Sequence, residues 1–186
     1  VTGGLSSYAD AISNLPTGGG DQKQALPNGI CFRGSTIEVF DLSPYDWSMV
    51  YDYSEMFDGC KQLTGFGDNF GNAFRGMLSM GYMFRGCSKL TSIPQLDTSK
   101  VVDMRYMFNG CSSLTSIPEL DTSKVLSMGG LFYGCSKLTS IPQLDTSKVT
   151  DMQYMFNGCS SLTSIPQMDT TKVTDMQYMF SGCQSI

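Results

Sequence analysis

The sequence predicts an α/β repeat solenoid, in which coils of one short strand and one short helix stack on each other. The last five of the seven cysteines, from Cys87 to Cys183, lie 24 residues apart. A fixed period of about 20–50 residues is typical of solenoids. The surrounding residues repeat as well, because MFNGCSSLTSIP occurs from both Met107 and Met155. Together these two observations predict coils of 24 residues.

The first half of each unit predicts a short strand. CSSLTSIP, from Cys111, is rich in Thr and Ile and places Leu114 and Ile117 three residues apart. Proline cannot donate to a strand ladder, so we expect the strand to end at Pro118.

The second half predicts a short helix. In VTDMQYMF, residues 149–156, the apolar side chains stand at positions 1, 4, 7 and 8, which share one helical face. Thr150 with Gln153 fits a capping box. Gly158 suits the left-handed residue that ends a helix.

One coil cannot bury its apolar side chains alone, so stacking is expected to align equivalent residues into columns. The predicted core columns are Leu90, Leu114, Leu138 and Leu162; Ile93, Ile117, Ile141 and Ile165; Phe84, Phe108, Phe132, Phe156 and Phe180; and Cys87, Cys111, Cys135 and Cys159.

The composition divides the chain into two parts. Residues 1–35 predict an N-terminal tether and cap region, and residues 36–186 the solenoid. Its coils are degenerate over about 36–86 and regular over about 87–186. We expect a helix over Ser6–Leu15, a capping strand over Ile30–Phe40, and an open edge at the last coil that a continuing or a second chain covers.

Charge and composition exclude several classes of function. The net charge is −5, which argues against a nucleic-acid binder. The chain contains no histidine, which excludes Ser-His-Asp and Cys-His catalysis and every His-ligated metal site. No stretch approaches the about 18 apolar residues of a membrane span.

The six cysteines from Cys60 onward follow glycine at equivalent positions, and the sequence contains no C-x-x-C pair. We therefore predict buried, reduced thiols. Disulfides between neighbouring coils are the alternative. Because the number of cysteines is odd, at least one thiol would stay unpaired.

A column of aspartates suggests either a cation ladder or turns. Carboxylates with Thr98 and Ser99 could bind Ca²⁺, but no calcium-loop pattern is present. Side chains that bond nearby backbone amides are the favoured interpretation, and we predict neither metal nor cofactor. The column is Asp97, Asp121, Asp145 and Asp169, each followed by a lysine, Lys100, Lys124, Lys148 and Lys172.

Tyrosines recur five residues before the cysteines, and Gly130 interrupts the row. They are either partly buried beside the core or exposed for binding. If one face binds a ligand, the first candidates are Tyr82, Tyr106, Tyr154 and Tyr178 with Arg105 and Gln153; the second are Thr115, Ser116 and Glu119 with their equivalents. The aspartates of the regular coils recur as a structural pattern, and nothing groups the three glutamates, so no pair of carboxylates predicts an enzyme.

MFNGCSSLTSIP and LDTSKVTDM resemble the BspA-like leucine-rich repeats, the bacterial surface protein repeat family, over about residues 36–186. Residues 60–76 depart from it by lacking the DTSK segment. The resemblance implies a leucine-rich-repeat solenoid of cell-surface or secreted proteins, used for adhesion, and carries no catalytic residues. Ser7–Gly20 is similar to linker segments of phage tail fibres.

We therefore expect a non-enzymatic recognition module, displayed on a bacterial surface protein or a phage tail fibre, that binds a cell-surface protein or glycan. It would lie outside the cell, without nucleic acid or membrane insertion. The alternative is a structural or assembly subunit, or a spacer, whose open C-terminal coil packs on another chain.

Overall fold

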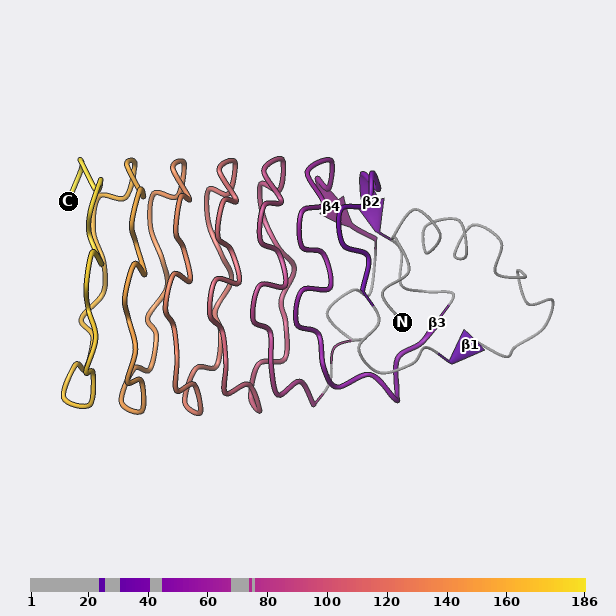
Figure 1. Cartoon of the computed structure of the whole chain (residues 1–186), viewed down its shortest axis with the longest axis horizontal. Coiled ribbons are helices and arrows are strands. Elements are labelled where there is room, and N and C mark those ends of the chain that lie inside the picture. The colour runs from indigo at the N-terminus through magenta and orange to yellow at the C-terminus, as the bar shows by residue number, and fades with distance from the viewer. Residues whose placement is uncertain (1–23, 26–30, 41–44, 68–73, 75) are drawn as a thin grey trace.

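The computed structural model describes residues 24–25, 31–40, 45–67, 74 and 76–186. They form a row of stacked coils that runs from the N-terminal to the C-terminal side of the molecule (Figure 1). Isolated parallel β-bridges join one residue of each coil to the next, in the order Asp52, Ser79, Asp103, Ser127, Asp151 and Asp175. The predicted repeat solenoid is therefore present, with 24-residue coils in register from Ser79 onward.

The longer β-pairs lie in the degenerate coils. Strand β1 (Gln24–Ala25) pairs in parallel with β3 (Tyr45–Asp46), and β2 (Val39–Phe40) pairs in parallel with β4 (Gly65–Phe66). Of the predicted capping strand at 30–40, only β2 is a strand among the described residues. The predicted helix at 6–15 and the linker resemblance at 7–20 lie outside the described residues.

The predicted helix of each coil is wrong, because no residue that the structure describes is helical. In the 149–156 segment, the Met155 amide donates to the Met152 carbonyl at 3.2 Å, a bond across three residues. The next amide back, that of Tyr154, donates to the Gln177 carbonyl of the following coil at 2.9 Å. A helix needs every amide to bond four residues back, whereas here alternate amides join neighbouring coils.

The predicted capping box is absent for the same reason. The Thr150 hydroxyl donates to the Leu126 carbonyl of the preceding coil at 3.2 Å, and the Gln153 amide donates to the Asp151 carboxylate at 3.0 Å. Gly158 is left-handed with φ 76°, as the sequence predicts, although it ends a series of turns and not a helix.

The segment predicted as a strand, 111–118, is not assigned as one either. Its backbone bond to the preceding coil runs from the Thr115 amide to the Thr91 carbonyl at 3.2 Å, and the Thr115 hydroxyl shares that acceptor at 3.3 Å. Pro118 offers no amide to extend the pairing. The parallel bridges lie in the half predicted to be helical.

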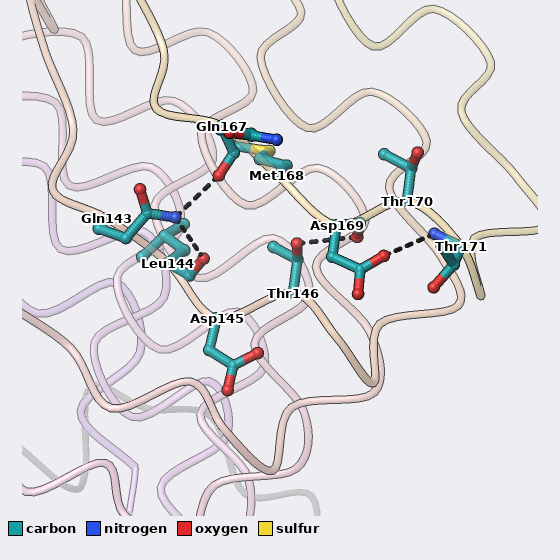
Figure 2. Close-up of a pocket in the computed structure, with 9 residues that line it drawn as sticks. All are labelled: Gln143, Leu144, Asp145, Thr146, Gln167, Met168, Asp169, Thr170 and Thr171. Carbon is teal, nitrogen blue, oxygen red and sulfur yellow. Dashed lines mark hydrogen bonds between the residues drawn. The ribbon is translucent and has the colours of Figure 1, made fainter.

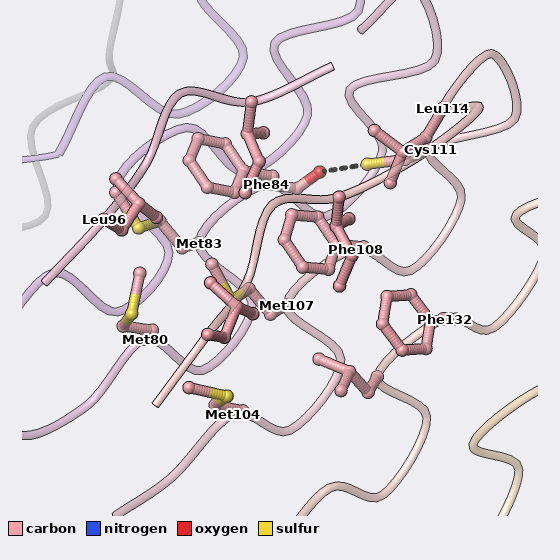
Figure 3. Close-up of a cluster of buried hydrophobic side chains, with 14 of the residues drawn as sticks. Met80, Met83, Phe84, Leu96, Met104, Met107, Phe108, Cys111, Leu114 and Phe132 are labelled. Carbon is pink, nitrogen blue, oxygen red and sulfur yellow. Dashed lines mark hydrogen bonds between the residues drawn. The ribbon is translucent and has the colours of Figure 1, made fainter. Parts of the chain in front are cut away.

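The core is a set of columns along the solenoid axis (Figure 3). Phe108 stacks between Phe84 and Phe132, with ring centroids 5.8 and 5.7 Å away. The leucine column and the phenylalanines up to Phe156 are fully buried, while Phe180 in the last coil is 41% exposed. In the isoleucine column, Ile93 and Ile117 are buried, and Ile141 and Ile165 are partly exposed. A further column of buried leucines, three residues after the isoleucines, was not predicted: Leu96, Leu120 and Leu144.

Each cysteine thiol donates to a carbonyl of the neighbouring coil. Cys111 donates to the Phe84 carbonyl at 3.1 Å (Figure 3), and Cys135 to the Phe108 carbonyl at 3.1 Å. All seven cysteines are free, with Cys87, Cys111, Cys135 and Cys159 fully buried. Burial raises the pKa of the Cys159 thiol to about 12, so the thiols are small packing groups with little nucleophilic character.

A buried carboxylate ties the first coils together. Asp58, 6% exposed, accepts hydrogen bonds from Arg33 at 2.7 Å and from Arg85 at 2.6 and 2.8 Å. Burial alone would raise the pKa of Asp58, but the hydrogen bonds from Arg85 and Arg33 outweigh it and lower the pKa. The ion pairs thus compensate for removing this charge from water.

No helix within the described ranges has the length and apolar character needed to cross a membrane.

Candidate binding face

One broad face of the solenoid carries the first-choice candidates. We call it the ladder face, because its residues flank the column of β-bridges: 78–82, 102–106, 126–130, 150–154 and 174–178. The middle residue in each of the first four segments, such as Met80 or Met152, points into the core and is fully buried. The neighbouring side chains therefore point outward and align along the axis.

The tyrosines form two stacked pairs. The rings of Tyr82 and Tyr106 lie 5.2 Å apart at 9°, and those of Tyr154 and Tyr178 lie 5.2 Å apart at 13°. Gly130 separates the pairs: a Cβ atom there would lie 2.2 Å from the Cε1 atom of Tyr106, so the Tyr106 ring covers this glycine.

Arg105 and Gln153 lie beside these pairs but differ in their contacts. Arg105 forms an ion pair with Asp103 at 2.8 Å, and this hydrogen bond raises the pKa of Arg105. The side chain of Gln153 has no hydrogen-bond partner within the described part of the chain. The structure therefore places one first-choice candidate in an internal ion pair and leaves the other available.

The stacking decides which part of each ring a ligand can reach. The two rings of each pair cover one another, and the Arg85 guanidinium lies 4.6 Å over the Tyr82 ring. Tyr133 packs against Tyr154 at 6.0 Å. The rings thus offer edges and hydroxyls, and the outer face of Tyr178, which is 61% exposed. Such a surface favours hydrogen bonding and edge contacts over sugar stacking on flat rings.

The ladder face also carries an apolar column that the sequence did not single out. We define the apolar column as Tyr51, in the coil before the ladder face, together with Leu78, Val102 and Leu126; all four stand nine residues before successive cysteines. Their exposed fractions are 55, 51, 39 and 49%. The sequence signal for this column was a recurring apolar residue outside the predicted core face. The prediction of a helix gave that position no role.

The second-choice candidates lie on the segment that returns across the core. Thr115, Ser116 and Glu119 are exposed. The Thr115 hydroxyl donates to the Thr91 carbonyl, and the Glu119 carbonyl accepts from the Gln95 amide group at 2.6 Å. The Thr115 side chain and the Glu119 backbone thus join neighbouring coils, and no hydrogen bond in the described part of the chain links these residues to the tyrosines.

A groove of about 670 Å³ lies between the last two DTSK-type corners, Gln143–Thr146 and Gln167–Thr171 (Figure 2). Its polar groups largely bond each other: Gln143 donates to the Gln167 carbonyl at 2.8 Å, and Thr146 to the Asp169 carbonyl at 2.9 Å. The Asp169 carboxylate accepts the Thr171 amide at 2.9 Å, which lowers the pKa of Asp169. The polar groups that line the groove are thus largely occupied by hydrogen bonds within and between the two turns.

The other aspartates of this column make the same turn. Each accepts the amide two residues ahead, from Ser99, Ser123 and Ser147 at 3.2, 3.0 and 3.0 Å. Within the described residues, no group of three or more Cys, Asp and Glu side chains is placed to hold a metal ion. The aspartates therefore act here as turn formers.

Comparisons with known proteins place the chain in a family. The family model described as "Mycoplasma protein of unknown function, DUF285" matches residues 78–186, more than half of the chain. A solved leucine-rich repeat protein from Eubacterium ventriosum ATCC 27560 aligns over 79% of this chain with 22% identity and a TM-score of 0.46. The alignment covers 43% of that protein's length. No curated protein matches the sequence, and no comparison supports the tail-fibre resemblance.

Proposed function

This chain belongs to the DUF285 family, and we propose that it is a non-enzymatic recognition module that binds a protein or glycan on cell surfaces. We place it outside the cell, on a bacterial surface protein. The repeat fold supports this proposal, because stacked coils build wide, regular surfaces suited to binding.

The observation that carries the proposal is the apolar column on the ladder face. Soluble proteins seldom expose contiguous apolar patches larger than about a few hundred Å², and extended patches mark interaction sites. Leu78, Val102 and Leu126 occupy consecutive coils and are each more than one-third exposed. In the two following coils the same position holds Thr150 and Thr174, so the solenoid does not require an apolar side chain there.

The chemistry of the thiols and carboxylates also favours binding over catalysis. The buried thiols have raised pKa values, and the exposed aspartates of the DTSK corners are bonded within their own turns. A hydrolase would need two convergent carboxylates in a cleft. We therefore propose no reaction for this chain and no cofactor.

A second function, assembly through the last coil, has its own support. Met176 and Phe180 are 49 and 41% exposed, whereas their equivalents Met152 and Phe156 are fully buried one coil earlier. Further coils of the same chain or a second chain stacked on this end would bury them. If a second chain does so, the protein serves as a spacer or assembly subunit, and its contacts lie along the axis.

Binding of the fluorescently labelled chain to a panel of bacterial and epithelial cells tests the first proposal. We expect saturable binding that is abolished when the cells are treated with protease, for a protein receptor, or with periodate, for a glycan. Absence of saturable binding on every cell type would contradict the recognition function.

Sedimentation of the same preparation tests the assembly function. Met176→Gln with Phe180→Gln should abolish concentration-dependent association if the last coil is the interface. Binding to cells should then persist in the double variant, because Leu78, Val102 and Leu126 are unchanged.

A further inference from the structure

We propose that the apolar column is the docking stripe for an amphipathic α-helix of a protein partner, which lies along the solenoid axis with its basic end over Asp151 and Asp175. This inference rests on the proposed recognition function and names the partner that the ladder face fits.

The spacing of the coils matches a helix. Bridged backbones of neighbouring coils lie about 4.8 Å apart, and the stacked tyrosines beside them are 5.2 Å apart. A helix rises about 5.4 Å per turn, so it can present one apolar side chain to each coil. An extended peptide places same-side residues about 6.6 Å apart and loses register within about three coils.

The strip between the apolar column and the tyrosines is small-sided in two coils and polar in the coil between them. Ser79, Gly81, Ser127 and Gly129 are small, but the carboxylates of Asp103 and Asp151 lie over Gly81 and Gly129, 3.5 and 2.7 Å from where a Cβ atom would stand. The middle coil carries the Asp103–Arg105 ion pair, so a helix on this face would contact the apolar column and these polar groups. The Tyr82–Tyr106 pair stands beside this strip and supplies ring edges and hydroxyls to the polar flank of the helix.

The carboxylates that stay unpaired among the described residues of the ladder face indicate where the basic end of the partner helix would lie. Asp103 already pairs with Arg105. Asp151 accepts only the Gln153 amide at 3.0 Å and the Ser127 hydroxyl at 3.1 Å, and Asp175 accepts the Gln177 amide at 2.9 Å. Neither forms an ion pair with a lysine or arginine within the described residues, although the charge of Asp151 contributes to the raised pKa of Arg105. These carboxylates lie just beyond Leu126, where the apolar column ends, and complement lysine or arginine on the last turns of the helix.

The probe is a designed, fluorescently labelled helical peptide of about 15 residues, about four turns long. It carries leucines on one stripe and lysines at one end. A peptide of the same composition with scrambled leucine positions is the control. Binding is measured by fluorescence anisotropy.

The matched variant combines Leu78→Thr, Val102→Thr and Leu126→Thr. The chain already uses threonine at this position in two coils, where Thr150 and Thr174 donate to the preceding carbonyls at 3.2 and 3.0 Å. The variant should therefore keep its urea unfolding midpoint. Its exposed column becomes polar.

We expect the striped peptide to bind saturably and the threonine variant to bind it at least about ten-fold more weakly. Asp151→Asn with Asp175→Asn should weaken binding and reduce its dependence on salt. Equal binding of the scrambled peptide, undiminished binding by the threonine variant, or no binding of the striped peptide would overturn the inference.

Two further measurements distinguish a helical partner from a second copy of the chain and from a partner that is not a helix. If the unmodified chain dimerises and the threonine variant is monomeric by sedimentation, a second copy occupies the column, which also overturns the helix. If cell binding disappears in the threonine variant while the striped peptide never binds, the recognition function stands and the helical partner is wrong.

Discussion

The backbone five residues before the cysteines is left-handed, with φ of 59, 53, 56 and 56° at Tyr82, Tyr106, Tyr154 and Tyr178. This conformation costs a non-glycine residue about 1–2 kcal/mol. Gly130 adopts it with φ 61° at no such cost. Glu55, five residues before Cys60, adopts it as well with φ 59°, so the turn of the coil imposes this conformation whether or not a ring is present. Gly130 leaves the space that the Tyr106 ring fills.

We expect Gly130→Ala to destabilise the chain by about 1–3 kcal/mol, because the new methyl group is strained and displaces the Tyr106 ring. Urea unfolding measures the loss. When Tyr106→Ala is also present, the new methyl group no longer meets the ring. The double variant should therefore lose less free energy of unfolding than the sum of the losses of the two single variants. Strict additivity of the two substitutions would contradict the contact.

Asp58→Asn should lower the free energy of unfolding at pH 7 by about 2 kcal/mol, because Arg33 and Arg85 lose a buried charged acceptor. Asp145→Asn, in an exposed turn, is the matched control. Urea unfolding of both variants tests the difference. Equal effects would show that the buried ion pairs add nothing.

The pH dependence of stability gives Asp58 a second test. Its pKa is lowered in the folded chain, so its stabilisation is complete above the unfolded value of about 3.9. It is lost as the pH falls through the lower folded pKa. The difference between the unmodified chain and Asp58→Asn should therefore narrow from pH 7 to pH 3, and a constant difference would contradict this assignment.

Among the elements, the phenylalanine column shows how stability depends on position along the row. Phe108 packs between two rings, whereas Phe180 stacks only on Phe156, at 5.7 Å, and is 41% exposed. Stability in a solenoid is roughly a sum over neighbouring interfaces. Equivalent substitutions should therefore have unequal effects.

We predict that Phe108→Ala costs about 3–5 kcal/mol and that Phe180→Ala costs far less. Thermal or urea unfolding of the two variants measures this contrast within one column. A similar loss in both would mean that the coils do not stack as described.

The cysteine column predicts a pattern of thiol reactivity. Five thiols are buried, and Cys31 and Cys183 are partly exposed. An aromatic disulfide reagent should label all seven thiols in denaturant but react quickly with Cys31 and Cys183 alone in the native chain. Fewer than seven thiols in denaturant would demonstrate disulfides and contradict the reduced column.

At the scale of the whole molecule, periodicity predicted the solenoid, the coil length and the Phe, Leu and Cys columns, since equivalent side chains must stack. It failed on the elements within a coil. Val149, Met152 and Phe156 have a spacing that suits a helix and also a series of turns. Only the bonds from alternate amides to the next coil distinguish the two, and these depend on a neighbour that local spacing does not describe.

The binding face was predictable in part. The tyrosine row was visible in the sequence, but its division into stacked pairs depends on how Tyr106 covers Gly130. The apolar column was missed because Leu78, Val102 and Leu126 resemble core residues until the coil is closed. Their exposure follows from the alternation of inward and outward side chains along the ladder, which a helical interpretation assigns differently.

The most direct test of the recognition account is saturable cell binding, measured side by side for the unmodified chain, the Leu78→Thr, Val102→Thr, Leu126→Thr variant, and a Thr115→Ala, Ser116→Ala control on the returning segment. The account predicts that the threonine variant loses binding and the control keeps it, at equal folded stability. Binding retained by the threonine variant and lost by the control would contradict the ladder face as the site of recognition.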